Sequence, residues 1–331
     1  MPNEFADSEK ITDWYLAGTE LSADAVAATE RKVASNPNDT ESRVKLLGFY
    51  FALRNGDESA QEAAQPHILW IISNFPDSEA AGEPWVRIRK SVDPSRYEAV
   101  REAWCENLRK HPDNAQVMAN AARFFLLNEM ALSEELLMQA QALEPDNAEW
   151  TERLGHLFSL KATDGDAASK SESHGKALEL FEAALAVEGK PRFYQLDTVA
   201  KAAFKAGHLD KARTYSTELL AIAPSFDRNW NYGNAIYTGN SILALIALGE
   251  GDMNLARTYM LAASLTPGSP QLDSFGPDLT IAKEMLDRGE REAVVNFLNN
   301  VSKFWDGRVE TITEWKEIIR RGQIPIFRPQ H

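Results

Sequence analysis

The chain has 331 residues, of which 44% are hydrophobic and 25% are charged, a composition that excludes a wholly disordered protein. The formal net charge is −14, and lysines and arginines never run beyond pairs. A nucleic-acid-binding domain would show a basic stripe, so we expect no nucleic-acid partner. Cys105 is the one cysteine, which excludes a disulfide within the chain.

Two further features bear on location. Residues 1–7 lack the basic and apolar regions of a signal peptide. The longest apolar stretches, such as 241–248, are far shorter than the about 20 residues that span a bilayer. We therefore expect a cytoplasmic protein with no membrane partner, whose acidity serves solubility.

Apolar residues recur at helical spacing along nearly the whole chain, and no stretch alternates as a strand does. Prolines and glycines fall between these segments, as they do between helices. The pattern predicts an all-α fold, with Pro66 in the first turn of a helix. In chain order, the helices expected first are 22–35, 40–54, 67–74, 78–90, 94–110, 114–127, 133–143 and 148–160.

A motif recurs farther along the chain, where small residues precede and follow a glycine turn at Gly207, Gly251 and Gly289. Leu154 and Gly155 begin a related copy after Pro145. Small side chains at such positions let two helices approach closely. The small or β-branched residues around the three glycines are Ala200, Ala212, Ala244, Ala256, Ala282 and Val294.

These residues resemble the tetratricopeptide repeat, whose helix–turn–helix unit has about 34 residues. The resemblance covers about residues 20–303 and implies a right-handed α-solenoid of roughly eight antiparallel helix pairs. Residues 1–19 are expected to form an N-terminal segment. Residues 304–331 are expected to form a capping helix and tail that cover the last apolar face.

The repeat loses its spacing at two places. Residues 161–174 are rich in Ser, Asp, Ala and Lys, and are predicted to form a mobile surface loop. It is either a tolerated insertion or a lid or partner contact. Residues 227–278 combine a lengthened first helix with a Pro/Gly-rich loop, which is long enough to fold back over the start of that helix.

Two interpretations of residues 227–278 stay open. The polar groups on the long helix and the loop either bond one another and brace an oversized turn, or converge on a pocket with apolar walls. Asn240 stands where the repeat usually has a bulky residue, so it needs a partner, which the loop is expected to supply. The residues of the predicted pocket are Asn234, Tyr237, Thr238, Asn240, Gln271, Ser274, Phe275 and Asp278.

The resemblance also implies a concave groove lined by first helices. Chaperone-tail binders of this family use a lysine–asparagine clamp, but Ala119 or Glu152 stands at the first lysine position here. A different peptide is therefore expected. The groove residues implied by the resemblance are Asn120, Arg123, Glu152, His156, Asp197 and Lys201.

Motifs for phosphate loops and zinc sites are absent from the sequence, so no cofactor or metal is predicted. The leading hypothesis is a non-catalytic interaction protein that binds a peptide or protein in the concave groove. The alternative is a small-molecule or peptide-binding protein, with or without catalysis, whose pocket lies between 231–241 and 269–278. A third is a structural subunit that assembles through tryptophan-rich faces. The oligomeric state is left open.

Overall fold

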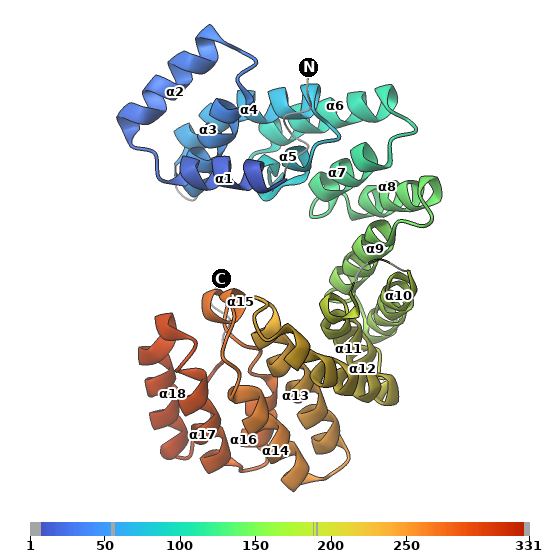
Figure 1. Cartoon of the computed structure of the whole chain (residues 1–331), viewed down its shortest axis with the longest axis vertical. Helices are drawn as coiled ribbons and strands as arrows, with labels where there is room; N and C mark the ends of the chain where they lie inside the picture. Colours follow the sequence, from blue (N-terminus) through green and yellow to red (C-terminus); the bar gives the residue numbers. More distant parts are fainter. Residues whose placement is uncertain (1–7, 54–56, 188, 190, 328–331) are drawn as a thin grey trace. The chain divides into compact units, whose positions relative to one another are not determined.

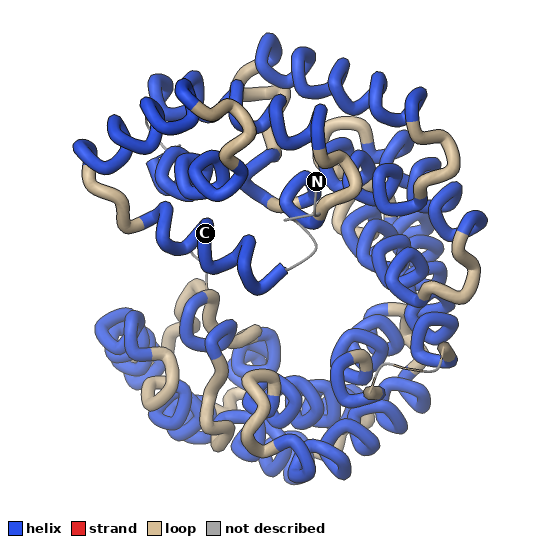
Figure 2. Tube along the Cα trace, turned by 45° about the horizontal axis from the view of Figure 1, so that its top comes forward, coloured by secondary structure: helices blue, strands red, loops and turns tan. Residues whose placement is uncertain are grey.

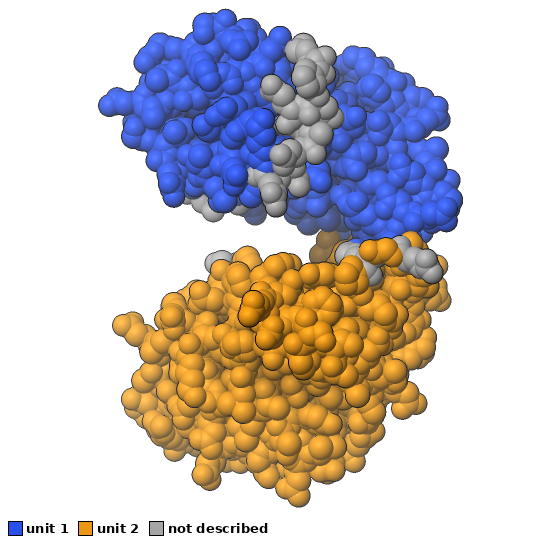
Figure 3. Space-filling model, viewed as in Figure 1, with its two compact units in different colours: residues 1–154 blue, residues 155–331 orange. Residues whose placement is uncertain are grey.

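The computed structural model describes residues 8–53, 57–187, 189 and 191–327. Every regular element within these residues is a helix, so the predicted all-α fold is confirmed (Figure 2). The chain divides into two compact units, residues 1–154 and 155–331 (Figure 3). The handedness of a superhelix and the number of helix pairs stay predictions.

In unit 1, residues 1–154, helices pack mainly on near neighbours along the chain, with α1 on α3, α3 on α4, and α7 on α8 (Figure 1). Its core includes Leu47, Ile71, Tyr97, Trp104 and Phe125, each at most 1% exposed. The helices are α1 (Ser8–Thr19), α2 (Ala23–Ser35), α3 (Thr40–Leu53), α4 (Glu58–Asn74), α5 (Glu79–Gly82), α6 (Pro94–Lys110), α7 (Ala115–Phe125), α8 (Met130–Leu143) and the beginning of α9 (Ala148–Lys161), with the 3-10 turn η1 (Pro84–Val86).

In unit 2, residues 155–331, α11 packs on α12, α12 on α13, α13 on α14, and α14 on α17 (Figure 1). The helices are the end of α9, α10 (Ala167–Ala186), α11 (Leu196–Lys205), α12 (Leu209–Ile222), α13 (Tyr232–Gly249), α14 (Met253–Ser264), α15 (Pro270–Ser274), α16 (Thr280–Asp287), α17 (Arg291–Val301) and α18 (Val309–Arg320), with the 3-10 turns η2 (Arg192–Tyr194), η3 (Ala223–Phe226) and η4 (Asp306–Arg308).

Side-chain caps define where many of these helices begin. An Asp or Asn precedes α4, α6, α7, α10 and α14, and its side chain accepts a hydrogen bond from the backbone N–H three residues later. Each cap satisfies one of the backbone donors that the first helical turn leaves without an acceptor. The capping residues are Asp57, Asp93, Asn114, Asp166 and Asp252.

The glycine turns of the repeat have one geometry. Gly207, Gly251 and Gly289 have φ of +78°, +83° and +87°, a left-handed conformation that glycine adopts without steric cost. In all three, the N–H after the glycine reaches back to a carbonyl of the preceding helix, for example from His208 to Ala203. This is the Schellman arrangement that ends helices. The recurring turn therefore reflects a shared local structure, although the spacing of its copies varies.

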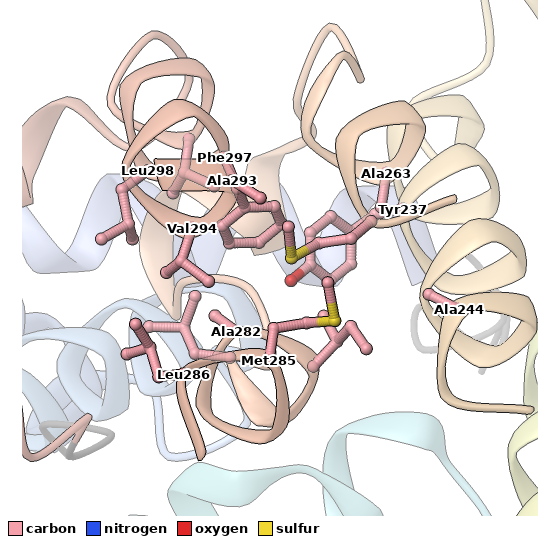
Figure 4. Close-up of a cluster of buried hydrophobic side chains, with 14 of the residues drawn as sticks. Tyr237, Ala244, Ala263, Ala282, Met285, Leu286, Ala293, Val294, Phe297 and Leu298 are labelled. Atoms are coloured by element: carbon pink, nitrogen blue, oxygen red, sulfur yellow. The ribbon is translucent and has the colours of Figure 1, made fainter. Parts of the chain in front are cut away.

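Small residues lie at the helix crossings, as predicted. Ala200, Ala212, Ala244, Ala256 and Ala282 are all 0% exposed. Around them, larger side chains complete the core of unit 2, where Phe297, Met285 and Tyr237 converge (Figure 4). The packing is thus of the kind the resemblance implies, with close backbones at alanine and large residues on the flanks.

Two predicted elements of unit 1 are wrong. Residues 78–90 were expected to form one helix, but only α5 and η1 form, and residues 87–89 have no regular structure. Pro66 lies inside α4 and not in a first turn, because Asp57 caps that helix well before the proline. The periodicity correctly predicted a helix that ends at residue 74, but the helix begins at Glu58, well before the predicted residue 67.

The insertion at residues 161–174 is largely helical and not a loop. The side chain of Asp166 accepts a hydrogen bond from the Ser169 N–H, and α10 runs from Ala167 to Ala186. The inserted residues thus lengthen α10 at its N-terminus, and residues 162–166 alone connect it to α9. An alanine-containing polar segment extends an existing helix readily because continuing a helix is cheaper than beginning one.

The first and last helices of the described chain both pack on a neighbouring helix. Helix α1, within the segment predicted as 1–19, packs on α3. Helix α18, within the segment predicted as 304–331, packs on α17 and buries Ile312, Trp315 and Ile319. The predicted boundaries at residues 19/20 and 303/304 stay predictions.

Candidate functional site

Polar and apolar side chains of unit 2 line a cavity of about 840 Å³. This volume lies within the range of about 300–1,000 Å³ that ligand sites occupy. It lies among α11, α13 and the segment 271–281. The residues that line it are Tyr194, Asp197, Thr198, Lys201, Phe204, Lys205, Trp230, Asn231, Asn234, Tyr237, Thr238, Ser241, Ile242, Leu245, Gln271, Leu272, Gly276, Asp278, Thr280 and Ile281.

The cavity is built on two helical stripes. On α13 and the residue before it, Asn231, Asn234, Thr238 and Ser241 face the cavity at spacings of three and four, as the sequence predicts for one helix face. On α11 a second stripe includes Asp197, Lys201 and Lys205 at spacings of four, with Thr198 next to Asp197. Two neighbouring first helices of the repeat therefore form two walls of the same site.

The Pro/Gly-rich loop folds back over the beginning of α13 and supplies a third wall. The Thr266 hydroxyl donates to the Gly233 carbonyl at 2.8 Å. A Cβ at Gly233 would lie 1.7 Å from the Gly268 carbonyl oxygen, so the two backbones approach as closely as glycine permits. The predicted fold-back is present, and it depends on the missing side chain at Gly233.

Amide side chains join this loop to the long helix. The Asn234 amide donates to Asn231 Oδ1 at 2.8 Å and to Gln271 Oε1 at 3.0 Å. Its own Oδ1 accepts a hydrogen bond from the Ser269 hydroxyl at 2.6 Å. Asn234 and Gln271 also line the cavity. The brace and the pocket, which the sequence left as alternatives, therefore share residues.

Tyr237 fixes the loop at a second point. Its hydroxyl donates to the Asp278 carbonyl at 2.6 Å, and its ring is 3% exposed. Burial, followed by the nearby Asp278 carboxylate, raises the pKa of the Tyr237 hydroxyl far above its ordinary value. The tyrosine therefore stays a neutral donor, and serves as a rigid wall of the cavity.

Some hydrogen-bonding capacity in the cavity remains unused. Thr238 is 6% exposed and lines the cavity, and its hydroxyl forms no hydrogen bond within the described part of the chain. Its oxygen is not sealed from solvent, so it faces the cavity with an unused donor and acceptor. Thr238 therefore presents a hydroxyl that a ligand in the cavity can bond.

Of the two lysines that line the cavity, only one has an ion pair with a described residue. Asp197 and Lys201 form an ion pair of 3.5 Å, whereas exposed Lys205 forms none with the described residues. Burial lowers the pKa of His174, and the positive charges of Lys205 and Lys170 lower it further. Lys205 therefore offers the cavity a positive charge that no described carboxylate pairs with, although the chain is acidic overall.

Trp230 lines the cavity and yet is 55% exposed. A large indole that stays half in solvent beside a cavity is typical of side chains that contribute strongly to binding partners. Sequence reasoning missed this residue because it precedes α13. It also missed Tyr194 and Lys205, although the spacing from Asp197 and Lys201 carried a signal for both.

The predicted pocket residues are partly brought together. Asn234, Tyr237, Thr238, Gln271 and Asp278 line the cavity. The other three lie elsewhere and are Asn240, Ser274 and Phe275. Asn240 is 8% exposed, and its amide donates to the Ile236 carbonyl of its own helix, so the loop does not supply its partner. Ser274 is exposed and Phe275 is 80% exposed, both outside the cavity lining.

The predicted groove residues of unit 1 differ in how deeply they are buried. Asn120 is 1% exposed and donates to the carbonyls of Pro76 and Ser78, so it holds the turn before α5 and is no surface residue. Arg123 is half-buried beside Glu83, at 3.8 Å. Glu152 is half-buried on α9.

In unit 2, Asp197 and Lys201 line the cavity. His156 is exposed and its ring meets Phe181 edge-on, with centroids 5.0 Å apart. From the sequence, Asp197 and Lys201 were expected in a groove and Asn234 in a separate pocket. In the structure all three residues line the same cavity of unit 2. Whether the remaining residues take part in binding stays a prediction.

Within the described ranges, no three His, Cys, Asp or Glu side chains come together to hold a metal ion. None of the described helices is long and apolar enough to cross a membrane.

Comparisons with known proteins find similarity in structure alone. No family model matches the chain, and a search of curated proteins finds no match. A crystal structure of MamA is 16% identical, with a TM-score of 0.40, over 53% of this chain and 90% of MamA. The APC/C hetero-tetramer Cut9–Hcn1 is 12% identical, with a TM-score of 0.41, over 96% of this chain and 64% of that one.

Proposed function

We propose that the chain is a helical-repeat interaction protein, and that the cavity of unit 2 binds a peptide segment of a partner protein. The observation that carries the proposal is a cavity of about 840 Å³ in which Thr238, 6% exposed, presents a hydroxyl without a hydrogen bond to the described residues. The fold alone does not establish the function, so the argument rests on this site.

The cavity has the features by which peptides are recognised. Ile242, Leu245 and Ile281 supply apolar wall, and exposed Trp230 offers a flat surface for a side chain of the partner. Thr238 supplies a hydroxyl for a backbone amide or carbonyl. Apolar walls with a few placed polar groups fix both the affinity and the orientation of a ligand.

Positive charge at one end selects the chemistry of the peptide. Lys205 has no ion pair with the described residues, and its field already lowers the pKa of His174. An acidic side chain of the partner beside Lys205 would complement this charge. We therefore propose a segment that carries a bulky apolar residue next to an aspartate or glutamate.

Catalysis is not part of the proposal, for a structural reason. Of the two carboxylates in the cavity lining, Asp197 pairs with Lys201, and Asp278 accepts hydrogen bonds from the Thr280 N–H and hydroxyl. Both carboxylates thus have partners that hold them in place. We therefore assign both groups to the walls of the site and give neither a catalytic role.

The experiment is a selection of displayed random peptides on the full chain, followed by titration of the selected peptides by calorimetry. We expect enrichment of an apolar residue next to an acidic one. Trp230→Ala is expected to weaken binding by about tenfold or more, because a central tryptophan contributes about 2 kcal/mol or more. Thr238→Val, which removes only the hydroxyl, is expected to weaken it less, by about threefold to tenfold.

Thr214→Val is the matched control, since the Thr214 hydroxyl on α12 is exposed and bonds to the Asp210 carbonyl of its own helix. This variant should bind as the unchanged chain does. Selected peptides that bind equally to the Trp230 and Thr238 variants would place the binding surface elsewhere and overturn the proposal. Native mass spectrometry that finds a small molecule in the purified chain, lost in Thr238→Val, would favour the small-molecule alternative.

A further inference from the structure

A second cavity, of about 300 Å³, lies entirely within unit 1. Residues 78–90 do not form the full helix that the repeat pattern predicts there. An extended segment after η1 covers α3 and α4 in place of a helix, and it leaves space that helical side chains would fill. The residues that line this space are Leu47, Tyr50, Phe51, Gln61, Ala64, Ile68, Trp85, Arg87, Ile88, Arg89, Val92, Asp93 and Arg96.

The walls are mainly apolar and are held in place. Leu47 and Ile68 are 1% and 4% exposed, so they present fixed aliphatic surface. Trp85 is 9% exposed and stacks on Tyr15, with ring centroids 4.2 Å apart and an interplanar angle of 19°. The volume is at the lower end of the range for ligand sites, which suits one small apolar group.

The charge of this cavity is positive. Arg87, Arg89 and Arg96 line it, against one carboxylate, Asp93. That carboxylate is already bound to Arg96, and it also caps α6 through the Arg96 N–H. Arg87 and Arg89 thus have no partner among the carboxylates that line the cavity. This local excess of positive charge contrasts with the net charge of −14 of the whole chain.

Arg87 is the arginine whose environment is most unusual. It is half-buried and forms no hydrogen bond and no ion pair within the described ranges, and its Nε lies out of contact with solvent. Burial lowers the pKa of Arg87, the charge of Arg123 lowers it further, and the Glu83 carboxylate, which forms no ion pair with Arg87, offsets these effects only in part. A guanidinium still remains protonated, so the charge stays there and an anion would stabilise it.

Donors outnumber acceptors in the same region. The indole Nε1 of Trp85, like the Nε of Arg87, is buried and has no acceptor among the described residues. Native structures leave few such donors, and each one calls for an explanation. An acceptor-rich group bound near Arg87 would reduce this imbalance.

We propose that the cavity of unit 1 binds a small organic carboxylate, with its apolar body against Leu47 and Ile68 and its carboxylate on Arg87. Charge complementarity selects the carboxylate, and the apolar walls select the aliphatic or aromatic body. The site is separate from the cavity of unit 2 and shares no residue with it. A negative result for one proposal therefore leaves the other unaffected.

The test titrates the full chain with a series of carboxylates, from acetate to octanoate, together with phenylacetate and 4-phenylbutyrate, followed by calorimetry and ligand-observed NMR. We expect saturable binding that strengthens with apolar size until the cavity is full. The matching amides and alcohols should bind about tenfold more weakly or worse, because hydrogen bonds to charged groups contribute more than neutral ones.

Two variants test whether the carboxylates bind in this cavity. Arg87→Gln is expected to weaken carboxylate binding by about tenfold or more. The melting temperature of the ligand-free chain should stay the same or rise, since a half-buried charge is removed. Ala64→Leu fills the cavity from α4 and should exclude the larger carboxylates. Arg109→Gln is the matched control, because Arg109 is exposed on α6 and lies outside the cavity lining.

Several results would overturn the proposal. One is that no member of the series binds saturably, and another is that amides bind as tightly as carboxylates. A third is that Arg87→Gln and Arg109→Gln bind alike. If Arg87→Gln fails to fold, Ala64→Leu decides, since size-dependent binding that it leaves unchanged cannot occur in this cavity.

Discussion

At the scale of single residues, Glu129 in unit 1 links α6 to the beginning of α8. It precedes α8, and its carboxylate accepts hydrogen bonds from the Tyr97 hydroxyl at 2.7 Å and from Arg101 at 2.8 and 3.3 Å. Burial alone would raise the pKa of Glu129, but the bonds from Arg101 and Tyr97 outweigh it, and the net pKa lies below the ordinary 4.5. The ionised form therefore stabilises the folded unit.

This linkage predicts a pH-dependent effect of Glu129→Gln. A carboxyl whose folded pKa is lowered contributes stability above its unfolded pKa, and loses it as the pH falls through the folded pKa. We expect the variant to lower the free energy of unfolding by about 1 kcal/mol at pH 7, because charge-assisted bonds become neutral ones. The difference from the unchanged chain should shrink below pH 4.5 in urea titrations.

Glu135→Gln on α8 is the control for this prediction, since Glu135 is exposed and bonds only to Gln139 among the described residues. Its effect should stay small at every pH. A difference between Glu129→Gln and the unchanged chain that persists at pH 3 would show that the carboxylate charge is not what stabilises the unit.

At the scale of elements, α13 and the loop 266–278 depend on each other. Gly233 lets the backbone of Gly268 lie against the first turn of α13, and Thr266 bonds to the Gly233 carbonyl. The loop in turn supplies Gln271 and Asp278 to the cavity of unit 2. The position of the loop is thus a condition for the shape of the proposed site.

Gly233→Ala is expected to displace this loop. The added Cβ would meet backbone atoms 1.7 and 2.4 Å away, and backbone cannot rotate aside as a flexible side chain does. Overpacking of this kind costs about 1–3 kcal/mol. We predict a lower melting temperature, faster hydrogen exchange in residues 266–278, and weaker binding of any peptide selected on the unchanged chain.

Gly249→Ala provides a comparison on the same helix. No atom lies within 4 Å of a Cβ built at Gly249, at the end of α13. The substitution should be neutral or slightly stabilising, by up to about 1 kcal/mol, because alanine favours helix more than glycine does. Equal losses in both glycine variants would mean that helix propensity, and not the contact with the loop, decides the effect.

At the scale of the whole molecule, the chain comprises two units with cores of their own. In unit 2, Phe297 is 0% exposed and packs with Tyr237 and Met285 (Figure 4). In stacked helical repeats each element contacts mainly its neighbours, so the stability of a distant repeat depends little on a local loss.

Phe297→Ala is therefore expected to destabilise unit 2 selectively. Removing a buried aromatic ring costs about 3–5 kcal/mol, through lost contacts and the cavity that remains. Hydrogen exchange should accelerate in residues 232–320 and stay near the original rates in residues 8–53. Val309→Ala, at a side chain 44% exposed, should change neither region. Equal acceleration in both units after Phe297→Ala would show that the chain unfolds as one cooperative body.

Much of the architecture follows from local sequence, and particular residues show why. The alanines at 200, 212, 244, 256 and 282 predicted close helix crossings, and all of them are fully buried. Asn231, Asn234, Thr238 and Ser241 recur in the sequence at spacings of three and four, which places them on one helix face, and all of them line the cavity. Helical periodicity and residue size are properties of the chain itself, so a sequence displays them directly.

Other features depended on partners that are distant in the sequence. Asn120 has the polarity of a groove residue, but it is buried because the carbonyls of Pro76 and Ser78 accept its hydrogen bonds. Asn240 finds its acceptor in its own helix and not in the loop. Residues 78–90 have helical periodicity, yet they form only the short elements α5 and η1, and residues 87–89 have no regular structure. Polarity and periodicity do not reveal which neighbour satisfies a group.

The sequence by itself determined the all-α class, the glycine turns and the stripe on α13, since each depends on short-range geometry. The tertiary structure decided that Asp197 and Lys201 share one cavity with Asn234 and Thr238, and that Arg87 lies half-buried without a partner among the described residues. Such a site forms where separate helices meet. Its residues are close in space because of packing, and the spacing along the chain does not encode that proximity.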